Sequence, residues 1–110
     1  AADPFLRRHP ATVEIVGGQF GSGRVPSDHP LPTGLAATVE AVTGRRPALL
    51  GEPYGADMRL FIHEGGTPCV IFGPGDVKVA HSADEYVAID EAVDCAAVLA
   101  AYVRRVLVAS

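Results

Sequence analysis

The longest hydrophobic repeat of the chain lies near its C-terminus and predicts a helix over about 89–108. Two acidic residues, Asp90 and Glu91, stand near its start, and two arginines stand at 104–105 near its end. That order suits the helix dipole, which favours negative charge near the N-terminus of a helix and positive charge near its C-terminus. Apolar residues recur there at the three- and four-residue spacing of one helix face, namely Ile89, Val93, Ala96 or Ala97, Ala100, Val103 and Leu107.

Three shorter segments also have helical patterns. Residues 3–10 predict a helical turn, with an aspartate as N-cap and a proline at the first helical position. Residues 28–43 carry leucines and valines at helical spacing after Ser27 or Asp28 as N-cap, and a glycine follows them. Residues 56–64 predict a short helix whose crowded apolar side chains indicate that it is largely buried.

Between these helices lie three segments with the character of strands. Residues 12–16 alternate and are rich in β-branched side chains, and residues 47–50 form a short apolar run. Residues 68–72 are continuously apolar after a proline, which is typical of a strand buried on both faces. The alternation of strand and helix predicts an α/β fold, part of an open sheet packed by helices.

Length and composition restrict the class of protein. At 110 residues the chain is one domain or a piece of one, and its 48% hydrophobic content is ample for a core. The net charge is −4 and the basic residues are dispersed, so the sequence lacks the clustered positive charge that nucleic-acid-binding proteins carry. No apolar run reaches the roughly 18 residues of a membrane span, and the N-terminus lacks a signal-peptide pattern. We therefore expect a cytoplasmic protein without nucleic-acid or membrane partners.

Cysteine usage and the first residues add two further expectations. Cys69 and Cys95 have no CxxC spacing, so each is interpreted as a small hydrophobe in a reducing compartment. The chain opens on Ala-Ala-Asp-Pro without an initiator methionine. A processed or engineered N-terminus explains this start, and so does a fragment cut from a larger protein.

The loop after the third predicted strand holds a candidate metal ligand, His81. It follows the predicted carboxyl end of a buried strand, where α/β enzymes place their binding groups. Gly73 and Gly75 form a turn that lets backbone approach a ligand closely, while Asp84 and Glu85 can orient an imidazole or balance a cation. The alternative is a lone surface histidine, which is the more common case. Zinc needs three or four protein ligands, and no second ligand stands at a suitable spacing.

A second candidate site is the turn that contains Gly55, Asp57 and Arg59. Such a turn beyond a strand end presents backbone N–H groups to an anion. The alternative is an ordinary helix start in which Asp57 acts as a cap, worth about 1 kcal/mol.

Four motifs together resemble a known family. They are Tyr-Gly-Ala-Asp-Met-Arg at 54–59, Gly-Thr-Pro at 66–68, Phe-Gly-Pro-Gly-Asp at 72–76 and Ala-His-Ser-Ala-Asp-Glu-Tyr-Val at 80–87. The chain resembles the C-terminal part of the acetylornithine deacetylase, succinyl-diaminopimelate desuccinylase and glutamate carboxypeptidase family of metallopeptidases. The His-containing loop and its distance from the Gly-Pro-Gly turn are the more specific part of this resemblance.

The resemblance implies a hydrolase with two zinc ions, a glutamate as general base, and an N-acyl amino acid or peptide as substrate. It implies that His81 is a ligand to one metal and that the turn at 55–59 lies beside the substrate pocket. It also implies two regions. Residues 1–27 match the end of the lid, or dimerisation, domain with its hinge, and residues 28–110 match the C-terminal part of the catalytic domain.

The family's other ligands come from a His-x-Asp motif, a Glu-Glu pair and a further acidic residue, and this chain has neither of those two motifs. We therefore assign no catalytic residue here and expect the isolated chain to be inactive and not to retain the zinc ions. An alternative is a small stand-alone α/β module for binding or assembly without catalysis. As a piece of a sheet, the chain would expose strand edges, so we expect self-association.

Overall fold

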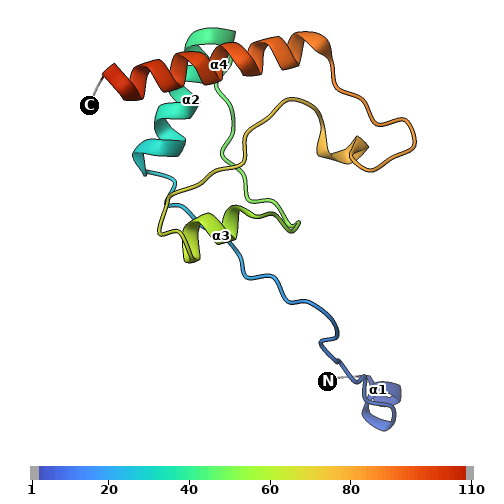
Figure 1. The fold of residues 1–110 in the computed structure, drawn as a ribbon. Helices are drawn as coiled ribbons and strands as arrows, with labels where there is room; N and C mark the ends of the chain where they lie inside the picture. The colour runs from blue at the N-terminus through green and yellow to red at the C-terminus, as the bar shows by residue number, and fades with distance from the viewer. Residues whose placement is uncertain (1–2, 109–110) are drawn as a thin grey trace.

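The computed structural model describes residues 3–108, and all regular secondary structure in that range is helical (Figure 1). Extended or irregular segments join the helices and account for the rest of the described chain. In chain order the elements are α1 (Pro4–Arg8), α2 (Pro30–Thr43), α3 (Met58–His63), the short 3₁₀ helix η1 (Val77–Val79) and α4 (Ile89–Val108).

The predicted α/β fold with an open sheet is wrong for this structure, because residues 3–108 contain no strand. The segments 12–16, 47–50 and 68–72 lack regular structure, and no backbone hydrogen bond joins them to one another. Their β-branched and apolar residues fit a pleated, half-buried surface, but such residues form a strand only where a neighbouring strand pairs with them. The three segments are apolar in sequence, but the prediction that they form strands of a sheet is wrong for the described residues.

Helix α1 forms as its sequence predicts. The side chain of Asp3 caps it, since Oδ1 accepts hydrogen bonds from the N–H groups of Phe5 at 2.7 Å and Leu6 at 3.2 Å. Pro4 takes the first helical position, where its missing N–H has no partner to lose. The ring of Phe5 stacks on His9 with ring centroids 4.3 Å apart. All of α1 is exposed at the end of an extended arm (Figure 1).

Helix α2 confirms the predicted helix, but its N-cap lies two residues after Ser27 and one residue after Asp28. His29 is the N-cap, and its Nδ1 accepts a hydrogen bond from the N–H of Leu31 at 3.1 Å. Pro30 explains this shift, because proline is favoured at the first helical position and leaves the cap to the residue before it. The predicted C-terminal glycine, Gly44, closes the helix at a φ of 72°.

The α2–α4 contact is the core of the molecule. Val98 of α4 is 1% exposed, and Leu35, Ala36 and Thr38 of α2 are buried. The two helices approach closely at Gly34, where an added Cβ would lie 3.3 Å from Cε2 of Tyr102. The hydroxyl of Tyr102 donates to the carbonyl oxygen of Leu31 at 3.5 Å across the same contact.

Two of the segments expected to be strands lie over α2. Residues 47–49 and 70–72, together with α2 side chains, enclose a cavity of about 90 Å³. The apolar side chains of these segments are therefore partly covered by a helix, although large parts of Leu50 and Ile71 stay exposed at 78% and 53%.

Helix α3 is not the largely buried helix that its crowded apolar residues predict. Leu60 is 40% exposed and Phe61 is 57% exposed. The reason is architectural, since no layer of the described chain covers the outer side of this helix. With the arm, this gives an elongated molecule whose radius of gyration is 19.6 Å, whereas a compact domain of this length has about 13 Å.

The accessible surface area also shows that the molecule is not compact. It amounts to 9014 Å², whereas a self-contained domain of this mass exposes about 5,800 Å². Many large apolar side chains are exposed, including Val13 at 88% and Val16 at 81%. No helix within residues 3–108 is long and apolar enough to cross a membrane.

The buried contact at Val98 gives a stability prediction. Val98→Ala removes two methyl groups from the centre of the α2–α4 contact and should lower the free energy of unfolding by about 1–3 kcal/mol. Urea titration followed by the helical circular dichroism signal measures the change. Val108→Ala is the matched control, because Val108 belongs to the same helix and is 80% exposed. An equal loss in both variants would contradict the placement of the core.

Candidate functional site

The turn that precedes α3 holds the predicted substrate-binding residues. Asp57 occupies the N-cap position, yet its side chain makes no cap hydrogen bond, and its backbone is already helical at φ −71° and ψ −5°. Its carbonyl oxygen accepts the N–H of Leu60 at 2.8 Å. The side chain of Asp57 therefore does not cap α3 with a hydrogen bond, as an ordinary cap residue would. Asp57 is exposed to solvent.

Phe20 lies against this turn. It is the first residue of the connector, the segment 20–26 that lies between the arm and α2. The guanidinium carbon of Arg59 stands 5.1 Å from the centroid of the Phe20 ring, within the range of a cation–π contact. A Cβ added at Gly55 would lie 4.0 Å from Cγ of the same ring. Phe20 thus lies next to Arg59 and Gly55, two of the three residues that the family resemblance places beside the substrate pocket.

Two further contacts hold the connector on α3. An added Cβ at Gly23 would come within 3.2 Å of the backbone of Arg59, so the close approach depends on glycine. On the next turn of the helix, Nε2 of His63 lies 2.8 Å from the carbonyl oxygen of Ser22. These contacts fix the residues around position 20 relative to the turn at 55–59.

Sequence reasoning missed Phe20. It assigned residues 1–27 as a whole to the end of the lid domain with its hinge and gave no role to any side chain of the glycine-rich segment 20–26. The available signal was a large aromatic side chain at the start of a glycine-rich segment, where the backbone is free to approach another element. Arg59 adds a second unusual feature, because its Nε is buried and has no hydrogen-bond partner within the described residues.

The loop that carries His81 is organised by short-range hydrogen bonds. His81 has a φ of 62°, a left-handed conformation that histidine adopts more readily than most non-glycine residues. Its N–H donates to Oε2 of Glu85 at 3.1 Å, and the hydroxyl of Ser82 donates to the carbonyl oxygen of Val79 at 2.7 Å. The Glu85 carboxylate therefore supports the backbone of His81 rather than its imidazole. The side chain of His81 is exposed.

The other predicted supporting residues differ in what they do. Gly75 has a φ of 91°, and its N–H donates to Oε2 of Glu91 at 2.9 Å, which ties the turn to the start of α4. Gly73 lines a cavity and has open space around its Cα. Asp84 is exposed, and its carboxylate makes no hydrogen bond within residues 3–108.

The described residues do not fit a complete zinc site. Zinc is bound by three or four protein ligands, and residues 3–108 contain no group of three or more His, Cys, Asp or Glu side chains placed to hold a metal ion. Within the same range, no hydrogen bond, salt bridge or ring contact joins the 55–59 turn to the His81 loop. The structure therefore presents two separate candidate elements.

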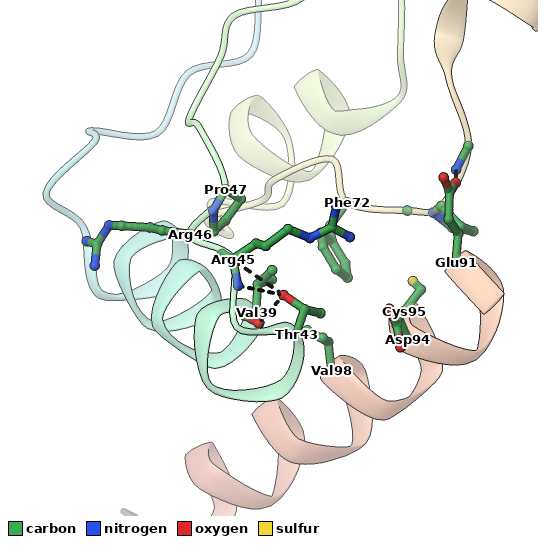
Figure 2. A pocket seen from close by; sticks show the side chains of 13 residues that line it. Val39, Thr43, Arg45, Arg46, Pro47, Phe72, Glu91, Asp94, Cys95 and Val98 are labelled. Atoms are coloured by element: carbon green, nitrogen blue, oxygen red, sulfur yellow. Dashed lines mark hydrogen bonds between the residues drawn. The ribbon is translucent and has the colours of Figure 1, made fainter. Parts of the chain in front are cut away.

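A cavity of about 420 Å³ lies elsewhere, between the C-terminal end of α2, the first half of α4 and the loop at 72–75 (Figure 2). Arg45 reaches across it toward Phe72, while Arg46 points away and forms a salt bridge with Glu40 at 2.9 Å. Arg45, Glu91 and Asp94 give the lining mixed charge, and Gly73 and Gly75 belong to it. His81, Asp57 and Arg59 do not line this cavity, so it is distinct from both predicted elements.

Comparison with known proteins gives three findings. Residues 9–105 match Peptidase family M20/M25/M40. Over 37 residues the chain is 54% identical to acetylornithine deacetylase of Myxococcus xanthus, a stretch that covers 34% of this chain and 10% of that protein. Over 82 residues it is 33% identical to N-formyl-4-amino-5-aminomethyl-2-methylpyrimidine deformylase of Bacillus subtilis (strain 168), covering 74% of this chain and 19% of the deformylase.

The matched stretches span about a tenth and about a fifth of the lengths of these two relatives. No solved structure matches the chain. Because the family match runs through residues 9–105, well over half of the chain, the resemblance suggested by its motifs is confirmed, and the chain belongs to the peptidase family M20/M25/M40.

Proposed function

We propose that this chain is part of a metal-dependent amidohydrolase, that is, of an enzyme that hydrolyses the amide bond of an N-acyl amino acid or a peptide. The family match over residues 9–105 is the observation that carries this proposal. The names of the two relatives, a deacetylase and a deformylase, agree with it, since removal of an acetyl or formyl group from nitrogen is amide hydrolysis.

In this proposal His81 supplies one zinc ligand, and the remaining ligands and the general base come from parts of the enzyme outside this chain. The loop geometry supports the role of His81. Its backbone is held in the left-handed region by the hydrogen bond to Glu85, which leaves the imidazole exposed for a metal. A zinc ion bound there would polarise the substrate carbonyl and lower the pKa of bound water. Residues 28–110 belong to the catalytic domain and residues 1–27 to the end of the lid domain.

Arg59 is proposed to bind the substrate together with Gly55 and Asp57. The guanidinium presents planar donors that match a carboxylate in a bidentate arrangement. The stacking of Arg59 on Phe20 restricts its orientation, and its Nε lacks a protein partner within the described residues. The free carboxylate of an N-acyl amino acid is the group that this arrangement suits.

The zinc role is tested by His81→Ala in the complete enzyme. Loss of a ligand should lower zinc content measured by mass spectrometry, and it should lower hydrolysis of N-acetyl amino acids by about a hundredfold or more. His9→Ala is the control, because His9 is an exposed histidine at the far end of the arm. If His81→Ala left the zinc stoichiometry and the rate of hydrolysis unchanged, His81 would not be a zinc ligand.

The substrate role is tested by Arg59→Lys, which keeps the charge and loses the planar fork. We expect KM for N-acyl amino acids to rise about tenfold, because a bidentate pair is worth more than a single charged contact. The corresponding amide substrates, which lack the carboxylate, should show little change. Arg24→Lys is the control, since Arg24 is exposed and lies outside the turn. Equal effects on both substrate classes would contradict carboxylate binding by Arg59.

The 110-residue chain by itself is proposed to be inactive. Because the described residues assemble no group of three metal-binding side chains, calorimetric titration with zinc should show no tight stoichiometric binding at neutral pH. The same preparation should not hydrolyse N-acetyl amino acids above the rate in buffer. Tight binding of one or two zinc ions would contradict the proposal that the site is shared with other parts of the enzyme.

A further inference from the structure

Phe20 is a large aromatic residue that does not belong to the core. It is 70% exposed within the described chain, whereas the buried apolar side chains there lie in α2 and α4. The ring nevertheless has a defined partner, because the guanidinium carbon of Arg59 stands over it at 5.1 Å from the ring centroid. An aromatic ring that stays exposed contributes little burial to stability, so we looked for a role of this contact in the substrate-binding turn.

The backbone next to Phe20 is fixed on α3 independently of the ring. Nε2 of His63 lies 2.8 Å from the carbonyl oxygen of Ser22. A Cβ added at Gly23 would come within 3.2 Å of the backbone of Arg59, so the connector passes close to the helix there. These contacts directly follow Phe20 in the sequence. They place the ring beside Arg59 without help from the ring itself.

An aromatic ring supports a guanidinium without using its hydrogen-bond donors. The positive charge is attracted to the ring face, whereas a carboxylate partner would occupy N–H groups in the plane of the guanidinium. Within residues 3–108 Arg59 forms no salt bridge, and its buried Nε has no hydrogen-bond partner. Arg59 is therefore held in place with its charge not neutralised and its donors available to an anion.

We propose that Phe20 is a positioning residue for the substrate carboxylate and that it acts through Arg59. The inference rests on the proposed function, in which Arg59 binds that carboxylate, and it adds a determinant from outside the turn at 55–59. Contact with the ring restricts a long flexible side chain before the substrate arrives, so less ordering is needed on binding. The effect is on affinity, because the carboxylate is bound equally in the ground state and the transition state.

Kinetics of the complete enzyme test this role. Phe20→Ala should raise KM for N-acetyl amino acids by about three- to tenfold and leave kcat unchanged. KM for the corresponding carboxamides, which lack the carboxylate, should not change. Phe20→Tyr keeps the ring and should stay within about twofold of wild type, whereas Phe20→Leu keeps only apolar bulk and should behave like Phe20→Ala.

The matched control for these kinetics is Phe5→Ala, since Phe5 is 61% exposed and lies in α1 at the end of the arm. It should leave KM and kcat unchanged. An unchanged KM in Phe20→Ala overturns the proposal. Full recovery in Phe20→Leu also overturns it, because apolar bulk rather than the ring face would then be what matters.

A double variant shows whether Phe20 acts through Arg59. Arg59→Ala removes the guanidinium, so adding Phe20→Ala to it should change KM by less than about twofold. An additive rise overturns the proposal, because Phe20 would then contact the substrate directly. If Arg59→Ala alone leaves KM unchanged, the substrate role of Arg59 in the proposed function fails. If Arg59→Ala raises KM and Phe20→Ala does not, only the role of Phe20 fails.

Arginine modification tests the contact without any substrate. Phenylglyoxal reacts with accessible guanidinium groups, and peptide mass spectrometry of the treated complete enzyme gives the rate at each arginine. Loss of the ring in Phe20→Ala should speed modification of Arg59 by about two- to fivefold. Arg24 is exposed and should keep its rate, so it serves as the internal reference. Equal rates at Arg59 in the wild type and in Phe20→Ala overturn the proposal.

Discussion

The α2–α4 contact is the constraint on which the described structure depends. It contains the buried side chains, and the segments at 47–49 and 70–72 are arranged around α2. The contact needs a small residue at Gly34, because Tyr102 occupies the space that a Cβ would take. Outside this pair the described segments are held by scattered hydrogen bonds and a few side-chain contacts, and large apolar side chains there remain exposed.

The two candidate elements are attached to this core in different ways. The His81 loop follows the Gly75 turn, whose N–H is bound by Glu91 at the start of α4, so its position is set by one of the two core helices. The Arg59 turn is supported instead by the connector, through Phe20, Ser22 and Gly23. In the described chain the metal-binding and substrate-binding candidates are therefore positioned independently.

Local signals in the sequence predicted the helices well. Asp3 with Pro4, the glycine at 44 and the repeat in α4 each specify a helix end or face through contacts within a few residues, and the structure contains them. The sheet was not predictable in the same way, because a strand depends on partners distant in sequence that residues 3–108 do not provide. His29 replaced Ser27 or Asp28 as the cap because Pro30 fixed the start of α2.

The candidate site was partly visible in the sequence. His81, Glu85 and the Gly-Pro-Gly turn were identified from their motif, and the structure adds that Glu85 binds the backbone of His81. Phe20 was missed because its role arises from a contact with residues nearly forty positions away. The repeat in α4 correctly predicted a helix, but it did not include Val98, which lies between Ala96 and Ala100 and is the residue that packs inward.

The contact of the connector with α3 has a mechanical consequence. Ser22 is bonded to His63 and Gly23 abuts the backbone of Arg59, so the arm is anchored at its base while α1 lies far from the core. The base of the arm is therefore fixed beside Phe20. The same short segment that anchors the arm also holds the aromatic ring against the Arg59 guanidinium, so the arm and the substrate-binding candidate share one support.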